Sequence, residues 1–264
     1  DIIASIPTMD AVALYRNTSS PGIISFDNPV DFAAGFDPLY TSIADLDSDG
    51  KPEIAAINRF SNSLSIYKNT TVSGGFTSSS FATKVDFPVG SEPYTVKIAD
   101  LNADNKPDIV VSNSVSNTIS IFENTSLQGS INSSSFASPI TLPTGIFPHT
   151  SFLTDFDGDG KIDIAVANIF SNTVSVFRSV YSGGPITALS FGSAINFAAN
   201  SGSVDLAATD IDGDGKVDIV VSNQSTDKIS LLKNISSPGS ISFEPHVDFV
   251  NGPYSAALLV ADID

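Results

Sequence analysis

The chain of 264 residues is long enough to bury a large core, and its 41% hydrophobic and 16% charged residues exclude intrinsic disorder. Its 12 basic against 29 acidic residues give a formal net charge of -17, which excludes nucleic-acid binding because no basic surface can neutralise phosphates. The absence of cysteine excludes disulfides and thiolate metal sites, and the best apolar run, 256–261, is too short to cross a membrane.

A strand-and-turn unit recurs five times along the chain. Its copies align on an aromatic residue, with spacings of 55, 55, 55 and 52 residues. Repetition at such a period predicts an array of similar supersecondary units. The aligned residues are Phe26, Phe81, Phe136, Phe191 and Phe243.

Each unit contains the pattern of four short strands in chain order. In one copy the first strand covers 96–101 and runs into an acidic loop, and the second leaves that loop as the apolar run 109–111. The third, 119–122, alternates with period two, which predicts one buried face. The fourth is expected to carry the aligned Phe.

Four antiparallel strands per unit, repeated at this period, predict an all-β fold, a β-propeller of four-stranded antiparallel blades. We expect one domain, 1–264, and favour five blades. Asp1 aligns with the last position of an acidic loop, and 262–264 aligns with the first three positions of another. The terminal segments are therefore expected to share a blade; the alternative is an excerpt of a longer array. The expected blades are 1–35 plus 253–264, 36–90, 91–145, 146–200 and 201–252.

Four acidic loops, 45–53, 100–108, 155–163 and 210–218, hold 15 of the 29 acidic residues. Calcium takes six to eight oxygen ligands, and carboxylates at alternate positions, a backbone carbonyl at the seventh and a closing carboxylate supply them. We therefore expect about four Ca²⁺ sites. The predicted ligands are Asp45, Asp47, Asp49, Lys51, Glu53, Asp100, Asn102, Asp104, Lys106, Asp108, Asp155, Asp157, Asp159, Lys161, Asp163, Asp210, Asp212, Asp214, Lys216 and Asp218, with each Lys contributing its carbonyl.

The alternative for these loops is a set of solvated Asp-rich turns, since Asp and Gly favour turns in any case. Crowding carboxylates without a cation raises their repulsion and their pKa values, so four such loops favour metal binding. The second loop is expected to lose metal first, because Asn102 replaces a charge and Asn105 replaces a glycine. We expect the ions to be structural, because nothing in the sequence indicates an open coordination position beside a substrate cleft.

The segments 93–111 and 155–166 resemble the FG-GAP and VCBS families of calcium-binding propeller repeats, and the likeness extends over essentially the whole chain. These families are known from integrin α-subunit heads and bacterial surface proteins. The resemblance implies a calcium-binding, extracellular β-propeller. Integrin-like rings usually have seven blades, whereas this chain has five repeats.

Residues that carry chemistry are few outside the loops, so we expect no enzyme but a non-catalytic adhesion, binding or structural module at the cell surface. Its partner would be a protein or glycan, with self-association into an array as a further expectation. One alternative is a propeller lectin. A second is an enzyme acting on polysaccharide or phosphoester, for which Glu92, Glu123 and Glu244 are the candidates outside the loops.

Two further sets of residues recur at equivalent positions. One set aligns at the entry to the innermost strand and is expected to ring one mouth of the channel: Leu39, Tyr94, His149 and Val204. The other opens the long connections with an N-glycosylation sequon: Asn17, Asn69, Asn124 and Asn234.

Overall fold

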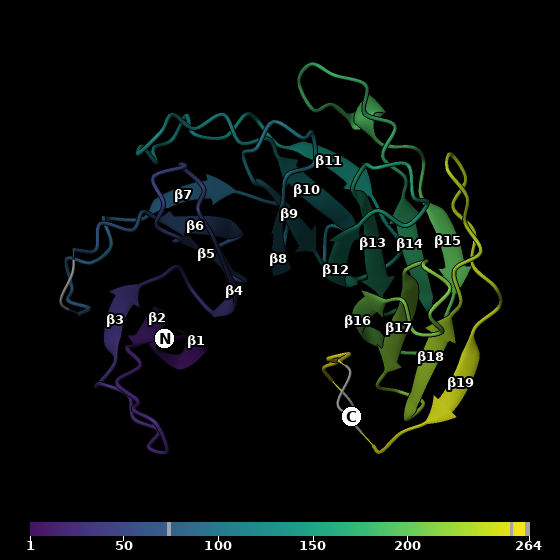
Figure 1. Cartoon of the computed structure of the whole chain (residues 1–264), viewed down its shortest axis with the longest axis horizontal. Helices are drawn as coiled ribbons and strands as arrows, with labels where there is room; N and C mark the ends of the chain where they lie inside the picture. Colours follow the sequence, from purple (N-terminus) through teal and green to yellow (C-terminus); the bar gives the residue numbers. More distant parts are fainter. Residues whose placement is uncertain (73–74, 254–255, 262–264) are drawn as a thin grey trace.

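The computed structural model describes residues 1–72, 75–253 and 256–261. They form five antiparallel sheets arranged in an arc, with successive innermost strands side by side (Figure 1). The predicted all-β propeller architecture is confirmed. The first sheet comprises β1 (Ile2–Ile6), β2 (Ala11–Tyr15) and β3 (Val30–Ala33). The second has β4 (Pro38–Ala44), β5 (Glu53–Asn58), β6 (Ser63–Tyr67) and β7 (Val85–Pro88).

The remaining three sheets repeat the second. The third comprises β8 (Pro93–Ala99), β9 (Asp108–Asn113), β10 (Thr118–Phe122) and β11 (Ile140–Pro143). The fourth comprises β12 (Pro148–Thr154), β13 (Asp163–Asn168), β14 (Thr173–Phe177) and β15 (Ile195–Ala198). The fifth comprises β16 (Ser203–Thr209), β17 (Asp218–Asn223), β18 (Lys228–Leu232) and β19 (Val247–Val250).

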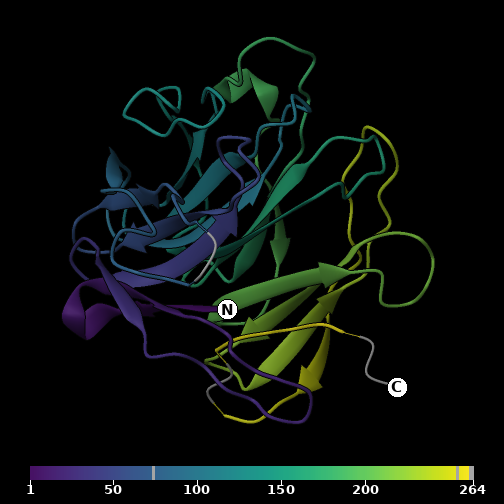
Figure 2. The ribbon, with the colours of Figure 1, turned by 60° about the vertical axis from the view of Figure 1, so that its left-hand side comes forward.

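The first sheet has three strands, so the shared blade differs from expectation. Residues 256–261 form no strand, and the amide of Leu258 donates to Asp205 Oδ2 at 2.7 Å, which holds this segment beside β16. Figure 2 shows the same segment near the fifth sheet. The predicted loop positions 262–264 lie outside the described residues.

The aligned phenylalanines precede the fourth strands and do not lie within them, contrary to the expectation. Each forms an isolated bridge with the residue that opens the long connection, as Phe136 does with Asn124. In the later units the ring packs on the preceding sheet, as Phe136 does at 5.3 Å from Phe87, edge to face, whereas Phe26 of the first unit is exposed. Packing between neighbouring sheets therefore explains why an aromatic residue recurs at this position, and pairing within the fourth strand does not.

In the first four sheets the strand equivalent to 119–122 is buried on both faces, which corrects the interpretation of its alternation. Ser120 is buried within β10, and its Oγ accepts a hydrogen bond from Asn113 Nδ2 at 2.9 Å. Asn113 Oδ1 in turn accepts the N–H of Gly90 at 3.0 Å. The alternating serines are thus hydrogen-bonded inside the sheet stack, and the period-two pattern does not mark a solvated face.

In the second, third and fourth sheets this contact requires the glycine that precedes the innermost strand, Gly35, Gly90 or Gly145. A Cβ added to Gly90 would lie 2.7 Å from Asn113 Cγ, because the backbone approaches the buried amide so closely. Gly192 offers a matched control, since its nearest neighbour would be the Arg178 carbonyl at 3.7 Å. Neither glycine has a positive φ, so the two sites differ only in the space available for a Cβ.

We predict that Gly90→Ala lowers the free energy of unfolding by about 1–3 kcal/mol through overpacking. Gly192→Ala should leave it unchanged or raise it by up to about 1 kcal/mol, because alanine restricts the unfolded chain. Urea denaturation of both variants measures the difference. Equal stability of the two would show that the Gly90 contact imposes no constraint.

Candidate metal centres

The four acidic loops occupy equivalent places in the fold. Each connects the innermost strand of a sheet to the second strand, as 45–52 connects β4 to β5. The sixth loop position has positive φ in every copy: +84° at Gly50, +86° at Gly160 and Gly215, and +66° at Asn105. Glycine adopts this conformation freely, and asparagine is among the residues that tolerate it. All four loops therefore make the same tight turn.

In the second sheet the first loop carboxylate organises the turn. Asp45 Oδ1 accepts the N–H of Asp49 at 3.1 Å, and Asp45 Oδ2 accepts that of Gly50 at 2.9 Å. The last carboxylate connects the turn to the sheet. Glu53 accepts the N–H of Leu46 at 2.8 Å on Oε2 and that of Asn69 at 3.2 Å on Oε1.

Three of the loops bring three carboxylates together, with one oxygen of each within 4.8 Å of the others. Asp47 Oδ1 is buried and has no hydrogen-bond partner. An unpartnered buried carboxylate oxygen is costly, so the site fits a cation at this point. The three clusters are Asp45, Asp47 and Glu53; Asp155, Asp157 and Asp163; and Asp210, Asp212 and Asp218.

The fifth-position aspartates lie outside these triads but share the same basic partner. Lys68 forms ion pairs with Asp47 and, at 3.0 Å, with Asp49. In the fourth sheet Arg178 contacts Asp157 and Asp159 at 2.5 Å each. Lys233 takes the equivalent place in the fifth sheet, facing Asp212 and Asp214. A basic side chain therefore faces the third and fifth positions of each triad-forming loop, and a metal ion bound there would have to displace it.

The third sheet departs from this arrangement. Among the described residues, 100–108 forms no cluster of three carboxylates, because Asn102 stands where the other loops have Asp. Glu123 stands where the other sheets have Lys68, Arg178 or Lys233, and the Asn102 amide donates to Glu123 Oε1 at 3.4 Å. Where the other sheets pair an acidic loop residue with a basic partner, the third sheet pairs the neutral Asn102 with the acidic Glu123. This pairing was not predicted from the sequence, although Glu123 lies 55 residues, one repeat, after Lys68.

Burial raises the pKa of three closing carboxylates, Glu53, Asp108 and Asp163. Loss of hydration is the largest cause for all three groups concerned, partly opposed by the two backbone N–H donors to each. The pKa of Asp163 rises to about 6 and that of Asp108 to about 7. The pKa of Glu53 is raised in the same direction. A nearby cation would favour the charged form of each group.

Three of the four expected mouth residues, Tyr94, His149 and Val204, come together on the inner strands, and Leu39 lies on β4. The rings of Tyr94 and His149 lie 3.4 Å apart, and His149 Nδ1 lies 2.5 Å from the Val204 carbonyl. Burial lowers the pKa of His149 to about 4, so its ring is neutral at pH 7. This histidine is therefore part of the packing around the channel.

The sequon asparagines of the third and fifth sheets are unsuited to glycosylation, because their side chains are buried. Asn124 Nδ2 donates to the Leu46 and Pro107 carbonyls at 2.8 and 2.9 Å. Asn234 makes the same pair of bonds to Phe156 and Val217. These amides join each long connection to the acidic loop of the preceding sheet.

Two solved structures illustrate the fold similarity. One is a protein from Lactobacillus plantarum, 15% identical with a TM-score of 0.61, covering 96% of this chain and 69% of that one. The other is the periplasmic gluconolactonase of Pseudomonas aeruginosa, 14% identical with a TM-score of 0.60, covering 93% of this chain and 65% of that one. At these identities the likeness shows the fold alone. No curated protein matches the sequence.

The second structure corrects one expectation. We expected no enzyme, on the ground that the repeated residues all serve the scaffold. A gluconolactonase with the same propeller fold overturns that reasoning, because the scaffold is compatible with catalysis.

Among the described residues, no helix is long and apolar enough to cross a membrane. The model of the FG-GAP-like repeat matches three overlapping segments, 45–111, 100–166 and 155–221, each of which begins at the first carboxylate of one acidic loop. Together the three segments cover more than half of the sequence, and each contains an acidic loop and the strands that follow it. The chain therefore belongs to the FG-GAP-like repeat family.

Proposed function

We propose that this chain is a calcium-stiffened β-propeller that serves as an adhesion, binding or structural module of an extracellular or surface protein. The observation that carries the proposal is the repeated carboxylate triad, with the buried and unpartnered Asp47 Oδ1 at one of its centres. Oxygen-only ligands at this spacing suit calcium, a hard cation that prefers carboxylates and carbonyls.

The predicted carbonyl ligands remain part of this proposal. Lys51 follows Asp49 in the turn, and its N–H donates to Asp49 Oδ1 at 3.0 Å, an arrangement repeated in the other loops. Each bound ion would connect an innermost strand to the strand beside it. Calcium-binding free energy would then add to folding free energy, because the unfolded chain has no assembled site.

The extracellular part of the proposal rests on the affinity that is typical of such calcium modules. Calcium modules outside the cell bind at roughly 10⁻⁴–10⁻³ M, a range in which cytosolic calcium would leave them empty. The exposed surface opposite the acidic loops supports a role in binding. The rings of Phe36 and Phe60 are in tilted contact with centroids 5.5 Å apart, and those of Phe147 and Phe170 with centroids 4.9 Å apart.

Those aromatic pairs lie at the opposite ends of the strands from the acidic loops, since Phe36 precedes β4 and Phe60 follows β5. Phe36, Phe60 and Phe170 are exposed, and Arg59 lies over the Phe60 ring at 4.2 Å. Exposed aromatic surface of this kind is typical of protein or glycan recognition. We assign the partner-binding role to this end of the propeller.

The first prediction concerns calcium removal. Adding Ca²⁺ to chelator-treated protein should raise the melting temperature, because each site filled at 100 times its Kd contributes about 2.7 kcal/mol. For a chain of this size that corresponds to at least about 5 °C. Differential scanning calorimetry with Ca²⁺ and with EDTA provides the measurement. An identical melting temperature in both buffers would refute the proposal.

The second prediction tests the individual triad. Asp47→Asn should reduce the number of bound Ca²⁺ ions by one, because it removes the charge of the buried carboxylate. Asp31→Asn, which changes an exposed aspartate on β3, is the matched control and should leave the number unchanged. Equilibrium dialysis with metal analysis counts the ions. Loss of no ion in Asp47→Asn would place the cation elsewhere.

The third prediction concerns pH. In metal-free protein the folded-state pKa values of Asp108 and Asp163, about 7 and about 6, exceed the ordinary 3.8. The folded state therefore binds protons more tightly, and these two groups make it more stable as pH falls from about 7 towards 4. Calcium binding requires the deprotonated groups. The calcium-induced rise in melting temperature should thus be smaller at pH 5 than at pH 8; an equal rise would contradict the assignment.

A further inference from the structure

Four of the sheets carry a buried serine in the strand next to the outermost one, β6, β10, β14 or β18. Each of these serines is at most 3% exposed, and its Oγ accepts a hydrogen bond from the asparagine that ends the second strand. A hydroxyl also has one hydrogen to donate, so each serine needs an acceptor as well. The serines and the residues opposite them on the outermost strand are Ser65 and Asp86, Ser120 and Thr141, Ser175 and Asn196, and Ser230 and Asp248.

In three of these sheets the opposite residue supplies the acceptor. The serine O–H donates to a side-chain oxygen of Asp86 at 2.5 Å, of Asn196 at 2.6 Å and of Asp248 at 2.9 Å. The third sheet has Thr141 at this position, and among the residues that the structure describes no acceptor for the Ser120 O–H is present. A buried donor without an acceptor is costly. The third sheet therefore lacks an oxygen atom that the other three sheets provide.

A groove of about 380 Å³ lies beside Ser120, between the second and third sheets. The end of β7 and the segment after it contribute Pro88, Val89 and Gly90, and the third sheet contributes Ser116, Thr118, Ser120, Pro139 and Thr141.

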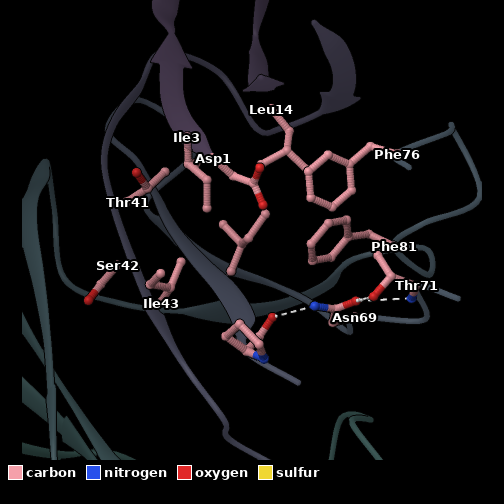
Figure 3. Close-up of a pocket in the computed structure, with 12 residues that line it drawn as sticks. Asp1, Ile3, Leu14, Thr41, Ser42, Ile43, Asn69, Thr71, Phe76 and Phe81 are labelled. Carbon is pink, nitrogen blue, oxygen red and sulfur yellow. Dashed lines mark hydrogen bonds between the residues drawn. The ribbon is translucent and has the colours of Figure 1, made fainter. Parts of the chain in front are cut away.

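The cavity between the first and second sheets differs from this groove in its lining. It has a volume of about 460 Å³ and is lined mainly by apolar side chains, among them Leu14, Phe76 and Phe81 (Figure 3). Four hydroxyl groups line the groove at the third sheet, so its ligand is expected to be polar.

Three of the four groove hydroxyls accept hydrogen bonds from the protein itself. Ser116 Oγ accepts the N–H of Ser91 at 2.6 Å. Thr118 Oγ1 and Ser120 Oγ accept the Asn113 amide at 3.2 and 2.9 Å. Each of these hydroxyls keeps its hydrogen and a lone pair for another partner. None of the described lining residues is charged, so the groove suits a neutral ligand whose oxygen atoms both accept and donate hydrogen bonds.

We propose that this groove binds a neutral saccharide unit. A sugar hydroxyl oxygen accepts from Ser120 where the other sheets place a side-chain oxygen, and the C–H face of the sugar ring packs on Pro88 and Pro139. The volume lies within the range of small-molecule sites, about 300–1,000 Å³. The proposal rests on the binding role proposed above and names its ligand class. No residue of the four acidic loops lines the groove.

Saturation-transfer NMR on the full chain in calcium buffer tests the proposal with four neutral disaccharides: maltose, cellobiose, lactose and diacetylchitobiose. At least one should bind with a Kd of about 1 mM, because a few hydrogen bonds in an open groove give weak affinity. If none of the four receives saturation from the protein at about 10 mM, a range that covers such a Kd, the proposal is overturned.

Variants of the protein locate the binding. Thr141→Asn gives Ser120 the internal acceptor that the fourth sheet has in Asn196, so it should weaken sugar binding at least about 10-fold without lowering the melting temperature. Ser120→Ala removes the donor and should weaken binding in the same direction. Thr83→Asn is the matched control, because it changes an exposed threonine outside the groove, and it should leave binding unchanged. Equal sugar binding by Thr141→Asn, Ser120→Ala and the control would refute this location.

Two comparisons complete the test. A longer oligosaccharide of the series that binds should bind at least as tightly as the disaccharide if the ligand is part of a glycan chain, and should fail to bind if the groove takes only a free sugar. The calcium-induced rise in melting temperature separates this proposal from the proposed function. A rise without sugar binding would refute the groove alone, and sugar binding without a rise would refute the calcium sites alone.

Discussion

The buried carboxylate that closes each acidic loop is the constraint on which the rest of the structure depends. Glu53 accepts one N–H from its loop and one from the connection after β6, so it joins an innermost strand, a turn and an outer connection. Its burial raises its pKa, and a bound cation, which we propose to be calcium, would offset this cost. The same pair of backbone hydrogen bonds recurs at Asp108, Asp163 and Asp218.

Neighbouring sheets are coupled through the same loops. Leu46, the second residue of its acidic loop, packs against the next sheet. The Asn124 and Ser126 side chains of that sheet donate hydrogen bonds to the Leu46 carbonyl. The order of an acidic turn and the packing of two sheets therefore depend on one another. Calcium bound at one end of the strands would stiffen the whole sheet, including the exposed aromatic pairs at the opposite end.

Much of this organisation is readable from the sequence, because repetition separates required positions from free ones. The loops, the strand order and the five sheets follow from spacing and period. Other features do not follow, since they depend on contacts between units. Ser120 gives the alternating pattern of a half-exposed strand, yet its side chain is buried and hydrogen-bonded. The Asn124 side chain, part of a sequon, is buried and hydrogen-bonds to the loop of the preceding sheet. Glu123 stands, 21 positions after Asn102, where other sheets have a basic residue. The path of 256–261 beside β16 depends on one bond to Asp205 that no pattern marks.

A crystal structure of the full chain grown with ample Ca²⁺ tests the central claim most directly. The account predicts an ion about 2.3–2.6 Å from carboxylate oxygens in each triad, with Asp47 Oδ1 among its ligands and Lys68 displaced from the third loop position. Triads that contain no ion, with Lys68 and Arg178 still paired to the loop aspartates, would contradict it.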